Sequence, residues 1–314
     1  MNSATSSPID EIRAAFDHGS VVPYLGPAAL PADAPVPASP EALATFITSK
    51  VSVPHKIRKR LTAAAQFVEN FKHRKTLVDL VNSAFKPGAT PTALQSWLAG
   101  RSDIAMIVDT WYDNAVQTAL AARRDWGEVQ GLSQAEHFGT WFAWYDPAGQ
   151  AADAAQAAQW ATLLYRPIGG VQPAANYLVS DSDYVEVLTE IDIQTPIPPE
   201  VQTRRRGRHF LFLGCRFTEQ LQRSFARQIM KRSCDRHWAV LPGALSRNEA
   251  RFLLEQGIER IDMSLEEFLA AMQLPGRNAD AGAAAAVRVA QAQAGGAVAG
   301  PLLAPEQLAG SLAS

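Results

Sequence analysis

The chain has 314 residues, of which 47% are hydrophobic and 19% are charged, and its formal net charge is −2. This length and composition allow one sizeable buried core with an appended lobe, or two modest domains. The small net charge provides no overall attraction to nucleic acid or to an anionic membrane, so we expect neither as a partner.

The first hundred residues predict one strand followed by a helical lobe. Residues 1–7 are polar, and we expect them to be disordered. After a short amphipathic helix, the apolar run 21–25 predicts a buried strand that ends at Gly26. The prolines between residues 27 and 40 remove backbone donors, which predicts a loop. The apolar spacing of residues 41–99 indicates helices, the first part of an inserted lobe.

The middle of the chain predicts a second buried strand and the rest of this lobe. The strand covers the apolar residues 104–108 and leads into DTWYDN. Residues 126–165 are assigned to the mostly helical insertion, with an Ala/Gln-rich helix over 151–164. A short strand at 177–179 then precedes SDSDY and a helix at 184–191.

The strongest local signal is the sequence RHFLFLGCRF at residues 208–217. Its apolar residues 209–213 do not alternate with polar ones, which indicates a strand covered on both faces. Gly214 ends this strand and a helical stretch, 218–230, follows, as in the strand–turn–helix units of nucleotide-binding folds. Two further strand–helix pairs are expected before residue 274.

The predicted fold is therefore α/β, a Rossmann-like three-layer parallel sheet over residues 8–274 with an inserted, mostly helical lobe. The Ala/Gly-rich residues 275–314 are poor in large apolar side chains, so we expect a disordered tail. The start of the chain lacks the features of a signal peptide, and no uncharged apolar run is long enough to span a bilayer. Two cysteines outside any CxxC pair favour a reducing cytoplasm.

No motif for metal or thiol chemistry stands out. The six histidines lack metal-ligand spacing, and none pairs with a cysteine in a zinc pattern, so we predict no metal site. Cys215 follows the strand at 209–213, where it is either a buried inert thiol, which we favour, or a thiol activated by a helix start.

Four short motifs resemble, in this order, those of the bacterial sirtuin-like proteins. They are VVPYLG, DTWYD, SDSDY and FLFLG. These proteins are relatives of the NAD-dependent deacylases, and many of them hydrolyse NAD in phage defence. The resemblance covers roughly residues 9–272 and implies a nucleotide site beside the glycine turns.

The sequence departs from the family pattern at its catalytic positions. The first loop keeps only Gly26 of the family's G-A-G-x-S, and without the second glycine it should bind a pyrophosphate poorly. The family's asparagine falls on Trp111 and its histidine on Ile168, and neither replacement can activate or position a nucleophile. We therefore predict no catalytic residue and no bound cofactor.

Several family residues nevertheless remain. The vestigial site comprises Gly26, Trp111, Asp113, Asp183 and Gly214. The retained residues Asp113, Asp183, Tyr184 and Gly214 are expected to cap helices and form turns, with nucleotide contact as the alternative interpretation.

Two groups of side chains are candidates for binding a partner. The aromatic cluster Trp141, Phe142, Trp144 and Tyr145 fits either core packing or interface anchors, because its flanking segments are polar. The basic run Arg204, Arg205 and Arg206 fits either a solvated cluster or a surface for an acidic partner.

The first functional hypothesis is a pseudoenzyme, a catalytically inactive sirtuin-like protein that binds another protein. Degenerate members of the family occur beside nitrogen-fixation genes, so the resemblance points to nitrogenase or one of its accessory factors as the partner. The alternative is a protein that hydrolyses or senses a nucleotide, NAD or ADP-ribose, with Asp113 and Asp183 supplying the carboxylates.

Overall fold

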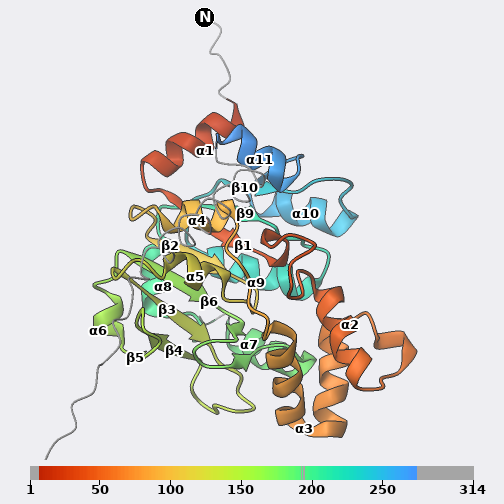
Figure 1. Cartoon of the computed structure of the whole chain (residues 1–314). Coiled ribbons are helices and arrows are strands. Elements are labelled where there is room, and N and C mark those ends of the chain that lie inside the picture. Colours follow the sequence, from red (N-terminus) through yellow and green to blue (C-terminus); the bar gives the residue numbers. More distant parts are fainter. Residues whose placement is uncertain (1–6, 192, 194, 274–314) are drawn as a thin grey trace, which may run out of the picture.

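A nine-stranded, mostly parallel sheet forms the centre of the protein in a computed structural model that describes residues 7–191, 193 and 195–273 (Figure 1). Its strands are β1 (Val21–Leu25), β2 (Met106–Asp109), β3 (Trp126–Gly131), β4 (Phe142–Tyr145), β5 (Ala151–Ala152), β6 (Thr162–Arg166), β9 (His209–Leu213), β10 (His237–Val240) and β11 (Ile258–Ile261). Their order is β11-β10-β9-β1-β2-β6-β3-β4-β5. Only β4 and β5, at one end, join by antiparallel pairing. The predicted α/β fold is confirmed.

Both faces of the sheet are covered, as the apolar strands predicted. In β1, Val22 and Tyr24 belong to one hydrophobic cluster, whereas Val21 and Leu25 belong to a second cluster. Because neighbouring side chains of a strand point to opposite faces, the two clusters are the two cores on either side of the sheet. β9 pairs with β1 in parallel along its whole length, so the FLFL strand lies in the middle of the sheet.

Each core is closed by its own set of helices. One core receives residues from α1 (Pro8–Asp17), α4 (Ala93–Ala99), α5 (Ala115–Leu120) and α11 (Leu265–Ala271). The other core receives residues from α2 (Pro40–Lys50), α3 (Leu61–Phe85), α7 (Asp181–Ile191), α8 (Pro199–Arg204), α9 (Gln220–Met230) and α10 (Arg247–Glu255). The result is a three-layer arrangement of helices, sheet and helices.

The helical lobe predicted for residues 41–99 is present. Ser39 begins α2 by accepting a hydrogen bond from the Ala42 amide, and α2 packs against α3. α3 is divided at His73, whose φ of 71° and ψ of 152° are not helical. The two halves project from the body of the protein (Figure 1).

The assignment of residues 126–165 to a helical insertion is wrong. This stretch contains four strands of the main sheet, β3 to β6, and only one short helix, α6 (Ala154–Ala157). β6 is buried along its whole length between β2 and β3, so its pairing outweighs the helical preference of the Ala/Gln-rich sequence before it. A separate two-stranded sheet, β7 (Gly169–Gly170) and β8 (Asn176–Tyr177), follows.

The ends of the chain carry predictions that the structure does not address. The disorder expected for 1–7 and 275–314 concerns positions that, except for Ser7, lie outside the described residues. Within the described part of the chain, no helix combines the length and the hydropathy needed to cross a bilayer.

Candidate functional site

A cavity of about 170 Å³ lies at the carboxyl ends of the central strands. Its walls include the turns that follow β1, β2 and β9. The strand order reverses at β1, because β2 and β6 follow on one side of it while β9, β10 and β11 lie on the other. Ligands of α/β proteins bind in the crevice at such a reversal. The fold therefore places this cavity where a ligand site is expected.

Gly26 and Gly214 bring the turns after β1 and β9 into direct contact. The amide of Ala28 donates a hydrogen bond to the Gly214 carbonyl over 3.0 Å. A Cβ atom on Gly26 would lie 2.5 Å from that carbonyl oxygen, and one on Gly214 would lie 2.2 Å from the Ala29 nitrogen. Gly214 also has a φ of 67°, which favours glycine. The absence of a side chain at each glycine thus allows the backbone of the other turn to come this close.

Trp111 forms one wall of the cavity and is held in place from two directions. Its side chain is buried, and its Nε1 donates a hydrogen bond of 2.7 Å to the Pro37 carbonyl in the proline-rich loop. Its ring meets the edge of Phe85, with the ring centroids 6.0 Å apart. The indole therefore ties the loop after β1 to the turn after β2.

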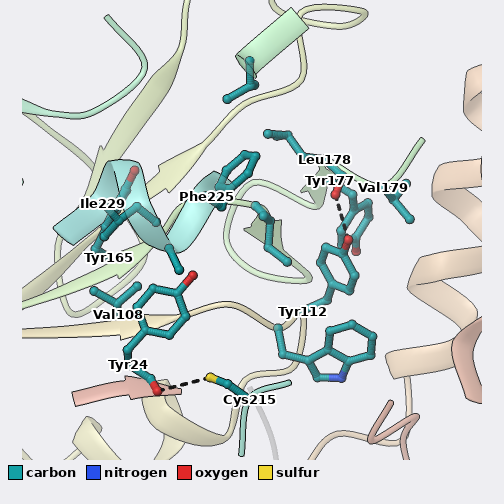
Figure 2. Packing of buried hydrophobic residues seen from close by; sticks show 14 of the residues in the cluster. Tyr24, Val108, Tyr112, Tyr165, Tyr177, Leu178, Val179, Cys215, Phe225 and Ile229 are labelled. Atoms are coloured by element: carbon teal, nitrogen blue, oxygen red, sulfur yellow. Dashed lines mark hydrogen bonds between the residues drawn. The ribbon is translucent and has the colours of Figure 1, made fainter. Parts of the chain in front are cut away.

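The rest of the wall is aromatic and aliphatic. Ile168, which is 6% exposed, lines the cavity together with Tyr24, Tyr112 and Phe225. Figure 2 shows the Tyr112 hydroxyl directed to the Leu178 carbonyl, a hydrogen bond of 2.7 Å. Burial raises the pKa of Tyr24 well above its ordinary value of 10.0, so its hydroxyl stays neutral.

Cys215 lines the cavity as a buried thiol. Its Sγ lies 3.5 Å from the Tyr24 carbonyl oxygen (Figure 2). Burial raises the pKa of the thiol well above its ordinary value of 9.0, which removes the thiolate needed for nucleophilic attack. The favoured interpretation of an inert cysteine agrees with this environment.

Charged side chains occur only among the more exposed lining residues. Lys59 and Arg60 are exposed at the start of α3. Arg216 pairs with the buried Glu249 through two contacts, Nε to Oε1 at 3.0 Å and Nη2 to Oε2 at 3.1 Å. Glu41 and Glu219 lie at the starts of α2 and α9.

Asp113 and Asp183 do not line the cavity, although the sequence grouped them with it. Asp113 accepts a hydrogen bond of 2.8 Å from the Ala115 amide at the start of α5. Asp183 accepts hydrogen bonds from two backbone amides at the start of α7 and forms an ion pair of 2.8 Å with Arg74. Both carboxylates therefore cap helices, and the structure does not bring them together with Gly26 and Trp111 at the cavity.

A buried charged cluster behind Trp111 was not predicted. Arg166 at the end of β6 is fully buried and donates a hydrogen bond of 3.1 Å to the Trp111 carbonyl. Its Nε lies 3.5 Å from Asp109 Oδ2. Burial raises the pKa of Asp109 to about 8 and that of Glu128, in β3, to about 7. The only sequence signal was the presence of charged residues inside otherwise apolar strands.

Most of the predicted aromatic cluster is packed into the protein. Trp144 is buried, and Trp141 and Phe142 pack against the core. Phe142 and Trp144 meet edge to face with centroids 5.8 Å apart on β4. Tyr145 is half-buried. A nearby aromatic residue that sequence reasoning missed, Phe138, is instead 95% exposed.

Two of the three arginines in the basic run do not form a solvated cluster. Arg205 is 1% exposed and donates hydrogen bonds to the carbonyls of Gln228 and Ile229 at the end of α9, so as a surface candidate it was wrong. Arg204 donates to four backbone carbonyls that lead into β2 and β6. Arg206 is exposed. The guanidinium groups of Arg204 and Arg205 donate to backbone carbonyls that an apolar side chain would leave without a hydrogen bond.

Within the described ranges, no group of three or more His, Cys, Asp or Glu side chains could hold a metal ion. The buried part of the cavity wall is uncharged, and the charged lining residues lie at its more exposed positions. The buried part can therefore hold a small, largely apolar group.

Sheet order, glycine turns and cavity position together define a Rossmann-like α/β protein with its site at the strand ends. Residues 105–261, half of the chain, match the family described as SIR2-like domain, and the chain belongs to that family. A comparison with curated proteins found no match.

Proposed function

We propose that this SIR2-like protein is catalytically inactive and acts by binding another protein. The observation that carries the proposal is the occupation of the cavity wall by Trp111 and Ile168, where the family resemblance places an asparagine and a histidine. An indole tied to Pro37 and an aliphatic side chain neither position a water molecule nor accept a proton.

The size of the cavity supports the same proposal. Its volume of about 170 Å³ is smaller than the roughly 300–1,000 Å³ typical of sites for drug-sized ligands. A dinucleotide is larger still. A rearranged active site would require the carboxylates of Asp113 and Asp183. Both accept hydrogen bonds from backbone amides instead, and Asp183 is also paired with Arg74.

Incubation of the purified protein with NAD tests the proposal. We expect no nicotinamide release above that of buffer, and none from Asp113→Ala provided that its circular dichroism is native. Release by the wild-type protein that is lost in a folded Asp113→Ala variant would refute the inactive assignment.

On the strength of the family resemblance, the proposed partner is nitrogenase or one of its accessory factors. The proposed location is the cytoplasm. Exposed Arg206 and the half-buried Tyr145 remain candidates at the contact surface. Affinity capture from native extract, followed by sizing of the complex, should recover a stoichiometric partner. Recovery of the chain alone under gentle conditions would count against a binding role.

Nucleotide sensing without turnover is the second candidate. It is favoured by one observation, the position of the cavity at the strand-order reversal. Calorimetric titration with NAD and with ADP-ribose distinguishes the two proposals, and a flat titration with both ligands excludes sensing. Trp111→Asn provides a further comparison, because it enlarges the cavity at the position of the family's asparagine.

A further inference from the structure

We propose that the cavity is a socket for one apolar side chain, presented by an acidic segment of a partner protein. This inference rests on the proposed binding function and specifies the chemistry of the partner. It is carried by three features of the site, namely its volume, its wall and the charges beside it.

The volume fits a side chain better than a cofactor. A cavity of about 150 Å³ that is lined by apolar side chains contains no water and can bind benzene. The cavity described here, about 170 Å³, is close to that size. A phenylalanine or leucine side chain of a second protein would therefore fill it.

The buried part of the wall favours an apolar occupant because three of its polar side chains already have partners. The Trp111 indole donates to the Pro37 carbonyl, and the Tyr112 hydroxyl donates to the Leu178 carbonyl. Thr110 Oγ1 donates to the Leu25 carbonyl over 2.8 Å. Most of the surface that faces the space is apolar, including that of Ile168. Burial of apolar area is then the main source of affinity.

The charges beside the cavity favour an acidic segment around that side chain. Lys59 and Arg60 are exposed, and neither side chain has a hydrogen bond or ion pair within the described part of the chain. The positive charge of Arg216 is neutralised by Glu249. Residues 40–99 contain nine lysines and arginines but only three acidic residues, in a chain whose net charge is −2.

The two acidic lining residues offset this charge only in part. Glu219 accepts a hydrogen bond as the N-cap of α9, and Glu41 lies in the first turn of α2. Both are placed to interact with the positive ends of helices. Lys59 and Arg60 are therefore left to attract carboxylates from a partner.

The first experiment measures binding of three blocked pentapeptides to the full chain. Their sequences are Glu-Glu-Phe-Glu-Glu, Glu-Glu-Ala-Glu-Glu and Lys-Lys-Phe-Lys-Lys. Methyl NMR of Ile168 reports on the socket itself. We expect saturable shifts with the acidic phenylalanine peptide and at least tenfold weaker binding with each of the other two, because each lacks either the anchor or the charge.

Two variants with matched controls locate the binding. Thr62→Trp places a large side chain on the cavity wall, while Thr45→Trp makes the same change on the exposed face of α2, away from the cavity. Lys59→Glu with Arg60→Glu reverses the charge beside the cavity, and Lys56→Glu reverses an exposed charge nearby that does not line it. The first member of each pair should lose the binding, and the second should keep it within about twofold of wild type.

Equal binding of the alanine and phenylalanine peptides, or unchanged binding by a folded Thr62→Trp protein, would overturn the socket. Preference for the lysine peptide would overturn the acidic segment. If a captured partner still binds Thr62→Trp normally, the socket proposal is refuted while the proposed binding function stands. If the protein hydrolyses NAD, the proposed function itself is refuted, whatever the peptides do.

Discussion

Glu128 should make the protein less stable as the pH rises. It is buried in β3, and burial raises its pKa from the ordinary 4.5 to about 7. Between these two values the folded protein binds a proton that the unfolded chain releases. The stabilisation is therefore fully present below pH 4.5 and is lost as the pH rises through 7. The difference between the two pKa values corresponds to about 3 kcal/mol.

Replacing Glu128 by glutamine removes this proton. Gln117 and Gln130 now donate to the two carboxyl oxygens over 2.6 and 2.8 Å. The amide oxygen accepts from only one of them, and the amide N–H can donate to Gln130 Oε1, which has no partner, once that side chain turns. We expect Glu128→Gln to be more stable than wild type at pH 8 and to show a decline between pH 5 and 8 that is smaller by up to about 3 kcal/mol. Asp109, whose pKa is raised to about 8, preserves part of the decline.

Urea unfolding followed by tryptophan fluorescence at several pH values between 5 and 8 measures the effect. The exposed Glu255→Gln is the control, since it changes the same groups at the surface of α10. A free energy of unfolding that is flat or rising over this range in the wild-type protein, with the same profile in Glu128→Gln, would refute the assignment of a buried proton.

Three further changes test other parts of the fold. Arg166→Ala leaves buried carboxyl and carbonyl oxygens without their donor and should lower the free energy of unfolding by about 3–5 kcal/mol; native-like urea unfolding would contradict this. Gly214→Ala should cost at least about 2 kcal/mol, because its Cβ meets the neighbouring turn, while Gly243→Ala, with open space around its Cβ, should cost about 1 kcal/mol. Buried Cys215 should react with a thiol reagent far more slowly than partly exposed Cys234; equal rates in mass spectrometry would contradict the buried thiol.

Much of the fold could be predicted because its signals are local. The unbroken apolar runs of β1 and β9 indicated strands with two covered faces, and both lie in the centre of the sheet. The start of the last helix is equally local, since Ser264 and Glu267, the first and last residues of SLEE, form a capping box.

The strands between residues 126 and 166 could not be predicted from local pattern. β3 carries Glu128 and Gln130, and polar side chains within a strand ordinarily indicate a solvent-facing surface. Here they are buried because Arg166, far along the chain, and Gln117 join them in one polar cluster. Such compensation depends on tertiary structure, which the periodicity of a short segment does not contain.

For the candidate site, the sequence identified the turns but not their contacts. Gly26, Trp111, Ile168 and Cys215 all line the cavity. Asp183 lies elsewhere because Arg74 and the amides that begin α7 hold it. Lys59 and Arg60 lie beside the cavity, whereas Arg205 is buried. These positions depend on side-chain directions that only the folded chain reveals.

The hydrogen bond between Trp111 and Pro37 gives the indole a structural role that does not depend on any ligand. A side chain without a donor at this position would leave the proline-rich loop without this attachment to the turn after β2. Position 111 is therefore constrained by the order of that loop, whatever the cavity binds.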